Sequence, residues 1–298
     1  MAVGLWETAL VLHARRSGAA MESFLMLGRQ SLALEPGMID HLNRTYGVAL
    51  GKQDFVGQQW ADPLFRSLGA REVFALDYSD YEGAQFTHDM NRPWPGGVPP
   101  RQFDVVFDGG TLEHVFNLPQ ALLNAMSLVK TGGCFLGVSP ADGWLGHGFH
   151  QLQPELFFRF FGESNGFRLR GIWLAEFGPA APAARLFRLM DPAATGCRNL
   201  VPGRRPLVLL VHAEKIAETP AEPAWPGQSN YTSMWRDEGA EAGKGAGSSS
   251  PAWRRTLLRA LPRGIGHRIR LWLIAGKHAR LARAGWAEAD SLHSETSP

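Results

Sequence analysis

Short apolar runs alternate with longer segments of helical periodicity from residue 23 to about residue 165. The apolar runs predict strands at 23–28, 72–77, 84–90, 103–108 and 134–140. Helices are predicted at 35–47, 60–70 and 111–129, and in the stretch QPELFFRFFGESNGF. This alternation favours an α/β domain in which helices cover both faces of a mostly parallel sheet.

The end of this domain follows a different pattern. Two further predicted strands, 168–177 and 205–216, have no clear helix between them, so we expect them to pair antiparallel. The stretch that follows them is rich in Pro, Gly, Ala, Ser and Glu, which is typical of a linker. We therefore divide the chain into a domain at 1–216, a flexible linker at 217–252 and a basic amphipathic helical tail at 253–298.

The charge of the chain is concentrated in its tail. The formal net charge is only +2, yet nine Lys or Arg and no acid lie between Trp253 and Trp286. This tail could dock on the acidic remainder of the chain, lie on an anionic membrane surface, or contact nucleic acid without sequence preference. We expect possible peripheral membrane contact through 253–286 and no specific nucleic-acid partner. Flotation with liposomes, with and without 251–298, tests the membrane contact, and equal partitioning would exclude it.

Two cysteines, Cys134 and Cys197, give neither a disulfide framework nor a zinc motif. At the N-terminus, Arg15 and Arg16 follow the apolar run rather than precede it, which is the wrong order for a signal peptide. No window reaches 18 uncharged apolar residues. We expect a cytoplasmic protein, with the tail as its only candidate for membrane contact.

Carboxylates close several of the predicted strands. The residues at the strand ends are Gly28, Asp77, Asp89, Asp108 and Pro140. In an open parallel sheet the carboxyl ends of the strands meet at one crevice, where ligands bind. A carboxylate at such a place accepts hydrogen bonds from a ribose diol or an adenine amino group.

The stretch FDVVFDGGTLEHVFNLPQALLNAMSLVKTGGCFLGVSP, with these strand ends, resembles the class I S-adenosylmethionine-dependent methyltransferases over roughly 22–216. The resemblance implies a Rossmann-like, seven-stranded, mostly parallel sheet with an antiparallel last strand. It also implies S-adenosyl-L-methionine as the cofactor, with Asp77 holding the ribose, Asp89 the adenine edge and Gly28 the methionine end. Asp108 would line the crevice in which the methyl group is transferred.

The first motif of that family is altered in the stretch SFLMLGRQSLAL. Gly28 remains, but Met26 stands where the family has an acid, and Gln30 and Leu32 stand where it has glycines. Leu32 would crowd a backbone that approaches the cofactor closely. Arg29 could compensate by pairing with the methionine carboxylate. The cofactor is therefore either bound in an altered way or no longer bound.

The histidine that follows the fourth strand is the candidate general base. His114 has an unperturbed pKa near neutrality, which suits a group that accepts a proton during transfer. Asp108 is the second candidate catalytic residue, with helix capping as its structural alternative. Glu113 could simply stabilise the start of a helix.

A metal site is a third interpretation of the same residues. Some methyltransferases of this fold hold a divalent ion with the pattern E-x-x-E-H, but here its first acid is Gly110. Glu113 and His114 remain from that pattern, and His147 or His150 could contribute a further ligand. Because the first acid is missing, we assign no metal site. His147 and His150, in the stretch GHGFH, are assigned to a substrate-facing loop, with an ordinary surface loop as the alternative.

The function that follows is methyl transfer from S-adenosylmethionine to a small-molecule or glycan-like acceptor. The alternative is a non-catalytic relative that has lost the cofactor and serves as a binding or scaffold protein. A nicotinamide-dependent oxidoreductase is disfavoured because G-x-G-x-x-G is absent after the first strand. The hypothesis fails if Asp77 and Asp89 lie well apart, or if Leu32 and its neighbours fill the space beside Gly28.

Overall fold

A computed structural model describes residues 2–178, 184–201, 205–229 and 285–293. The chain divides into two compact units. The first comprises 1–189, 202–226 and 288–298, and contains the strands at 23–215 and both cavities discussed below. The second comprises 190–201 and 227–287. Most of the predicted tail, 253–284, lies outside the described residues.

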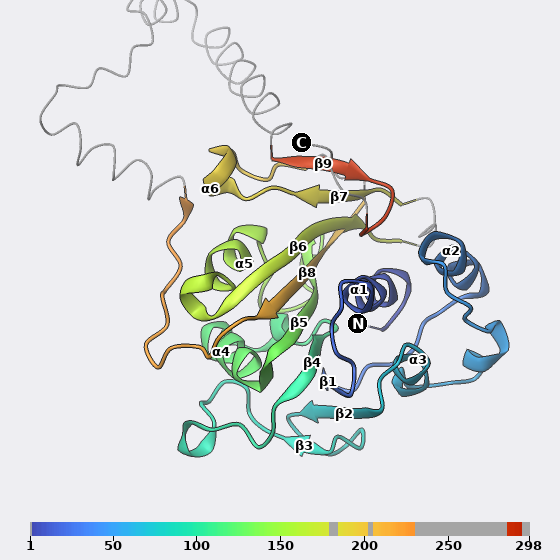
Figure 1. The fold of residues 1–298 in the computed structure, drawn as a ribbon, viewed down its shortest axis with the longest axis horizontal. Helices are drawn as coiled ribbons and strands as arrows, with labels where there is room; N and C mark the ends of the chain where they lie inside the picture. The colour runs from blue at the N-terminus through green and yellow to red at the C-terminus, as the bar shows by residue number, and fades with distance from the viewer. Residues whose placement is uncertain (1, 179–183, 202–204, 230–284, 294–298) are drawn as a thin grey trace, which may run out of the picture. The chain divides into compact units, whose positions relative to one another are not determined.

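Nine strands in the described part of the chain form one sheet in the order β3-β2-β1-β4-β5-β8-β6-β7-β9. Their bounds are β1 Ser23–Leu27, β2 Glu72–Asp77, β3 Phe86–Thr87, β4 Phe103–Asp108, β5 Val129–Asp142, β6 Phe167–Glu176, β7 Leu186–Leu189, β8 Leu207–Lys215 and β9 Trp286–Ala289. Figure 1 shows β1 and β4 near the middle of this sheet. The helices are α1 Leu5–Arg16, α2 Pro36–Tyr46, α3 Asp62–Ser67, α4 Leu118–Leu128, α5 Pro154–Phe160 and α6 Pro192–Thr195, with 3-10 helices η1 Lys52–Phe55, η2 Pro95–Gly97, η3 Leu112–His114 and η4 Glu163–Asn165.

The strands from β3 to β5 pair in parallel, as the alternating sequence pattern predicts. Leu27 pairs with both Leu76 and Asp108, so β1, β2 and β4 end side by side. β8 lies between β5 and β6 and runs antiparallel to both, which confirms the expected antiparallel last strand. The sheet thus has the predicted α/β architecture.

Two more strands are present than the seven expected. β7 and β9 each have only four residues, and they lie in stretches that the sequence analysis assigned to a loop and to the tail. β7 pairs antiparallel with the outer part of β6. Segments this short, one of them within an Ala- and Pro-rich stretch, carry too few residues to show a period-two pattern.

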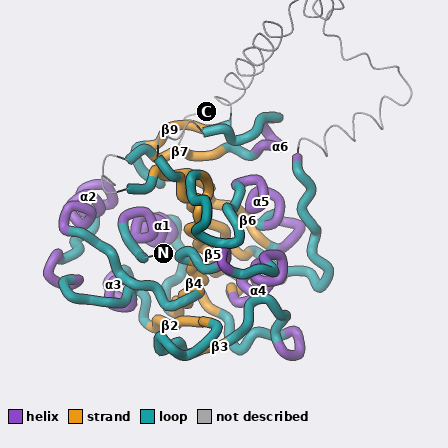
Figure 2. Tube along the Cα trace, turned by 180° about the vertical axis from the view of Figure 1, so that it is seen from behind, coloured by secondary structure: helices purple, strands orange, loops and turns teal. Residues whose placement is uncertain are grey.

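Helices cover both faces of the sheet, with α1, α2 and α3 on one face and α4 and α5 on the other (Figures 1 and 2). Proline stands in the first turn of α2, α4 and α5, where its missing N–H costs no hydrogen bond. Gly47 ends α2 in the left-handed conformation, with φ of 65°. These signals explain why the observed and predicted bounds of α2 agree closely.

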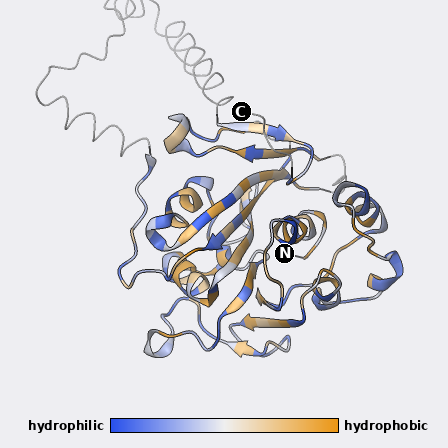
Figure 3. Ribbon diagram, in the orientation of Figure 1, coloured by the Kyte–Doolittle hydropathy of each residue, from blue (hydrophilic) through white to orange (hydrophobic). Residues whose placement is uncertain are grey.

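The core consists mainly of aliphatic side chains, and aromatic rings pack against each other on both faces of the sheet. Phe24 and Phe65 stack with ring centroids 4.3 Å apart, and Phe107 packs 5.4 Å from Phe65. On the opposite face Phe135 stacks on Phe161 at 4.8 Å. Figure 3 shows long apolar stretches along the strands and hydrophilic residues in many of the connecting loops. Burial of this apolar surface is the main driving force for the fold.

The predicted helix at 111–129 is wrong in its first third. The chain forms the short η3, then an irregular stretch, and only then α4. Pro119 in the first turn of α4 explains the late start, because a proline inside a continuous helix would remove a hydrogen bond and clash with the preceding turn. The predicted strand at 84–90 is likewise reduced to the two residues of β3.

Residues 217–226 are part of the first compact unit, beyond the predicted boundary at 216. The fully buried ammonium group of Lys215 donates to the carbonyl of Val129 at 3.0 Å and to the carboxylate of Glu218 at 2.8 Å. Asn165 donates to the carbonyl of Ala224 and accepts from its N–H, at 3.0 and 2.7 Å. The segment is therefore tied to the sheet by hydrogen bonds.

Candidate active site

A cavity of about 430 Å³ opens at the carboxyl ends of β1, β2 and β4. Its lining residues are Gly28, Arg29, Gln30, Ser31, Gln59, Trp60, Asp77, Glu82, Gly110, Thr111 and His114. Four of the predicted site residues are thus brought together from three different strand ends: Gly28, Arg29, Asp77 and His114. A cavity at this edge of a parallel sheet is where ligands of open α/β folds bind.

Gly28 makes the turn at the floor of this cavity. Its φ of 66° favours glycine, and its N–H donates to the carbonyl of Leu76 at 2.7 Å. A Cβ at Gly28 would lie 2.6 Å from the hydroxyl oxygen of Thr111, which itself donates to the carbonyl of Leu27. The glycine is therefore required by the close crossing of the chain after β1 and after β4.

Gln30, and not Leu32, occupies the space next to Gly28. The side-chain amide of Gln30 folds back and donates to the carbonyls of Leu27 and Gly28, at 3.0 and 3.2 Å. Leu32 instead bridges to Val3 and packs against the core. Leu32 itself therefore does not crowd Gly28, but its neighbour Gln30 fills part of the space beside that glycine, which the sequence analysis gave as a condition against cofactor binding.

Arg29 and Asp77 lie on two sides of the cavity. The guanidinium of Arg29 lies 4.7 Å from the centre of the Trp60 ring and donates to the carbonyl of Glu82 at 2.7 Å. Asp77 ends β2, and its carboxylate accepts from the N–H of Tyr78 at 2.6 Å. Both side chains keep further hydrogen-bonding capacity, because a guanidinium has five N–H donors and a carboxylate about four acceptor sites.

Asp89 lies close to Asp77 in the fold but does not line the cavity. β3 ends at Thr87, which pairs with Asp77, and Asp89 sits in the turn beyond it. The Asp89 carboxylate accepts from the backbone and side-chain amides of Asn91, at 3.0 and 2.8 Å, and lies 3.3 Å from the guanidinium of Arg92. The hydrogen bonds from Asn91 lower the pKa of Asp89 most.

Asp108 is buried and stabilises the turn that follows β4, which is a structural role and not contact with a ligand. One of its carboxylate oxygens accepts from the N–H groups of Thr111 and Leu112, at 2.8 and 3.2 Å. It does not line the cavity. Burial raises the pKa of Asp108, although these two hydrogen bonds oppose the rise.

Glu113 is a buried acid that the sequence analysis did not assign to the site. Its side chain is 0 % exposed, and neither carboxylate oxygen has a hydrogen-bond partner among the described residues. Burial, and then the negative charge of Asp108, raise the pKa of Glu113. Such a group is costly unless a proton or a positive charge accompanies it.

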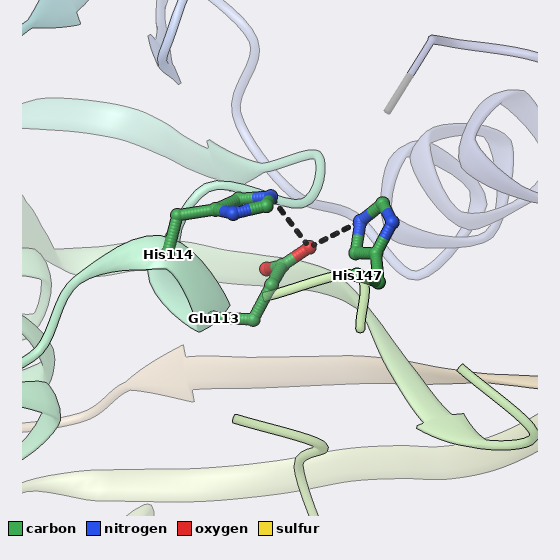
Figure 4. Close-up of side chains that lie close together, drawn as sticks. All are labelled: Glu113, His114 and His147. Atoms are coloured by element: carbon green, nitrogen blue, oxygen red, sulfur yellow. Dashed lines mark ion pairs between the residues drawn. The ribbon is translucent and has the colours of Figure 1, made fainter. Parts of the chain in front are cut away.

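Two histidines flank the Glu113 carboxylate, as Figure 4 shows. One of its oxygens lies 3.8 Å from Nε2 of His114 and 3.6 Å from Nε2 of His147. The three side chains place one ligand atom each within 4.8 Å of one another. We call this group the cleft triad: Glu113, His114 and His147.

The Gly/His loop is anchored to the backbone of the cleft triad. The N–H groups of Phe149 and His150 both donate to the carbonyl of Glu113, at 2.9 and 3.1 Å. Gly148 approaches so closely that a Cβ there would lie 2.9 Å from that carbonyl oxygen. Nε2 of His150 lies 3.3 Å from the carbonyl of Phe116, so His150 does not join the triad.

A second cavity of about 350 Å³ lies near the same loop. Its lining residues are Ala2, Gly4, Leu5, Trp6, Glu7, Ala33, Glu35, Met38, Trp144, Phe177 and Gly178. The indole N–H groups of Trp6 and Trp144 donate to the carbonyls of Glu176 and Leu207, at 3.1 and 2.9 Å. Trp144 also packs edge-on to His147, with ring centroids 5.2 Å apart. His114 of the triad thus lines the first cavity, and His147 contacts Trp144, which lines the second.

The comparisons with known proteins find likeness in structure alone. No family model matches the chain, and no curated protein matches its sequence. Among solved structures, it is similar to an S-adenosylmethionine-dependent methyltransferase from Clostridium acetobutylicum, with 11% identity over 72% of this chain and 74% of that chain and a TM-score of 0.29. A SAM-dependent methyltransferase from Aquifex aeolicus has 11% identity over 69% and 90%, with a TM-score of 0.34. An S-adenosylmethionine-dependent methyltransferase from Mesorhizobium loti has 14% identity over 68% and 94%, with a TM-score of 0.30.

These scores are too low to carry an argument about function. The strand order itself defines the fold: three strands on one side of β4, then β5, with an antiparallel strand inserted between β5 and β6. The chain has the Rossmann-like fold of the class I methyltransferases, as the sequence resemblance implies. Among the described residues, no helix combines the length and the apolar character that a membrane crossing requires.

Proposed function

We propose that this protein transfers a methyl group from S-adenosyl-L-methionine to an acceptor. The observation that supports this most is the cavity at the ends of β1, β2 and β4, in which Gly28, Arg29, Asp77 and His114 converge. A nucleoside cofactor needs a carboxylate for its ribose diol and a backbone that can come close, and Asp77 and Gly28 offer both. The cavity volume lies within the range of ordinary small-molecule sites.

The residues that would hold the cofactor fit its two ends. The carboxylate of Asp77 would accept hydrogen bonds from the ribose hydroxyls. The guanidinium of Arg29, already oriented by the Trp60 ring, would pair with the carboxylate of the methionine part. The Gln30 amide covers part of the floor beside Gly28, which supports an altered seat for the methionine part. When bound, the cofactor supplies a methyl group on a sulfonium centre that is already a good leaving group.

The chain's own contribution to the transfer is mainly positioning and proton removal. His114 lines the cavity and would accept the proton of a hydroxyl or amine on the acceptor. Burial and the neighbouring His147 lower the pKa of His114, so its imidazole is neutral at pH 7 and able to act as a base. Asp108 would hold the turn that carries Thr111 and Leu112 rather than contact the reacting atoms.

The second cavity supports a proposal about the acceptor. Because both indole N–H groups are already bonded to backbone carbonyls, Trp6 and Trp144 offer their apolar ring faces. Such faces suit a small molecule with a flat apolar side, for example an aromatic ring or the C–H face of a sugar. The acceptor would then extend past His147 toward His114. This proposal retains the small-molecule or glycan-like class expected from the sequence.

Calorimetric titration of the full chain with S-adenosylmethionine and S-adenosylhomocysteine tests the cofactor proposal. Both compounds should bind saturably, and Asp77→Ala should weaken binding at least tenfold by removing the acceptor for the ribose diol. Asp80→Ala, an exposed acid on the following loop, is the matched control and should bind as the unmodified chain does. Absence of binding for both compounds would contradict the proposal and favour the non-catalytic alternative.

A further inference from the structure

In the part of the chain that the structure describes, the buried Glu113 carboxylate lacks the hydrogen-bond partners or the positive charge that a buried acid normally needs. It is fully buried, has no hydrogen-bond partner for either oxygen among the described residues, and lies near a second buried acid, Asp108. An ionised carboxylate in such a place is strongly disfavoured unless it is balanced. Among the described residues, the groups that could balance it are the two histidines of the cleft triad, at 3.6 and 3.8 Å, which is beyond hydrogen-bonding distance.

The geometry of the cleft triad is close to that of a metal centre. Ligand atoms bound to one ion at about 2.1 Å lie roughly 3.0–3.4 Å from each other in octahedral or tetrahedral geometry. The distances from the Glu113 oxygen to the two imidazole nitrogens are 3.6 and 3.8 Å. The three ligand atoms all lie within 4.8 Å of one another, so the set would close with side-chain movements of up to about 1.5 Å. His114 and His147 can make them, because their side chains are 47% and 28% exposed.

The surrounding backbone already holds the ligands in place. The N–H groups of Phe149 and His150 fix the Gly/His loop on the carbonyl of Glu113, so His147 is brought back to the turn that carries Glu113 and His114. Gly148 permits this approach. These backbone hydrogen bonds thus bring together two segments that lie 33 residues apart in the sequence.

We propose that Glu113, His114 and His147 bind one divalent transition-metal ion. Two imidazoles and one carboxylate suit Zn²⁺, Fe²⁺, Mn²⁺ or Co²⁺, whereas an all-oxygen set would suit Mg²⁺ or Ca²⁺. Gly110 supplies no side-chain oxygen, so the donor set stays rich in nitrogen. The ion would balance the buried charge of Glu113 and leave coordination positions open on the side of His114, which faces the first cavity.

The chemical role that we give to the ion rests on the proposed methyl transfer. The proposal that the ion binds at the cleft triad does not depend on it. In a methyl transfer, a hydroxyl of the acceptor that reaches the open positions would lose its proton more readily, because a bound cation stabilises the oxyanion. His114 would then act as a ligand, and the proton would leave to water. If the chain does not bind S-adenosylmethionine, the metal site still stands or falls by metal binding alone.

The test is titration of the chelator-treated full chain with ZnCl₂ and with MnCl₂ by calorimetry, and with CoCl₂ by visible absorption. We expect one equivalent to bind, with a Co²⁺ spectrum in which ligand-field bands appear. His147→Ala and Glu113→Gln should each weaken binding at least tenfold. His150→Ala is the matched control, since it removes a histidine of the same loop that lies outside the triad, and it should bind as the unmodified chain does.

Three results would overturn the proposal: no saturable binding of any of the three ions, unchanged binding in His147→Ala, or an equal loss in His150→Ala. If Glu113→Gln fails to fold, His147→Ala decides, because His147 lies partly exposed in a loop. Titration with S-adenosylhomocysteine on the same samples separates the two proposals. Cofactor binding without metal binding overturns the metal site alone, and metal binding without cofactor binding overturns the methyltransferase alone.

Discussion

Two groups of three titratable side chains lie in the first compact unit, and their surroundings differ. The cleft triad of Glu113, His114 and His147 borders a cavity and has a carboxylate at its centre. The second group, which we call the buried histidine group, consists of His13 on α1, His212 on β8 and His293. In it, Nδ1 of His13 lies 3.2 Å from Nδ1 of His293, and the rings of His13 and His212 are 5.2 Å apart.

The two groups differ in how deeply their histidines are buried and in which ionisable groups lie next to them. In the buried group, burial lowers the pKa of His13 to about 4 and that of His212 to about 3, and the next contributors are other histidines and the arginines Arg188 and Arg170. Trp173 packs edge-on to His13 at 4.9 Å. These imidazoles behave as neutral core side chains. In the cleft triad the two histidines are instead partly exposed, and they share a buried carboxylate that could bind a cation together with them.

The largest expected effect is a loss of stability of the buried histidine group when the pH is lowered. Unfolded histidines take up protons near pH 6.5, whereas His13 and His212 in the fold resist protonation until pH falls to about 4 and about 3. Stability due to the neutral pair is therefore complete above pH 6.5 and is lost as pH falls below it. The expected loss is up to about 1.4 kcal/mol per pH unit for each histidine.

Urea unfolding between pH 7.5 and 4.5 measures this dependence. His212→Gln, which cannot titrate, should show a slope smaller by about one proton than the unmodified chain in the range from pH 6.5 to 4.5. The opposing contributions of Asp108 and Glu113, whose pKa values are raised, are present in both proteins and cancel in the difference. Equal slopes in the two proteins would show that His212 is not held neutral.

Metal should stabilise the protein through the cleft triad and not through the buried histidine group. A ligand that binds only the folded state at 100 times its dissociation constant raises the free energy of unfolding by about 2.7 kcal/mol. We expect this gain with Zn²⁺ or Mn²⁺ in the unmodified chain and in His212→Gln, measured by urea unfolding at pH 7.5. His147→Ala should lose it. If the gain in stability persists in His147→Ala but disappears in His212→Gln, the ion binds at the buried histidine group and not at the cleft triad.

The smallest effect should come from the loop that ties the cleft triad together. Gly148→Ala places a Cβ 2.9 Å from the carbonyl oxygen of Glu113, which the loop can relieve only by moving away. We expect a loss of about 1 kcal/mol in stability and weaker metal binding. Gly37→Ala, which meets no atom within 4 Å, is the control. If metal affinity is unchanged in Gly148→Ala, the loop does not position His147.

Much of the sheet could be predicted because its strands are short apolar runs with clear ends. The bounds of β2 and β4 match the prediction, since Asp77 and Asp108 end the apolar runs. The turn at Leu112–His114 was hidden because LEHV continues a helical pattern, and only Pro119 indicated that a new helix begins. β7 was too short to detect beside its Pro- and Ala-rich neighbours.

The site was predictable where it follows from strand ends and not where it depends on tertiary contacts. Gly28, Asp77 and His114 line one cavity because parallel strands end at the same edge. Asp89 does not line it, because β3 ends two residues earlier. The proximity of His147 to Glu113 depends on how the Gly/His loop folds back, and no local pattern reports that.

The buried ammonium group of Lys215 has a practical consequence for where the chain can be cut. A shortened protein that stopped at residue 216 would delete Glu218 and leave this cation inside the fold with a carbonyl oxygen as its remaining neighbour. An isolated buried charge of that kind is strongly destabilising. It would also strip Asn165 of both its bonds to Ala224 and uncover the ring of Phe160 that stacks on Trp225. A shortened protein that is meant to keep the sheet intact should therefore extend at least through Pro226.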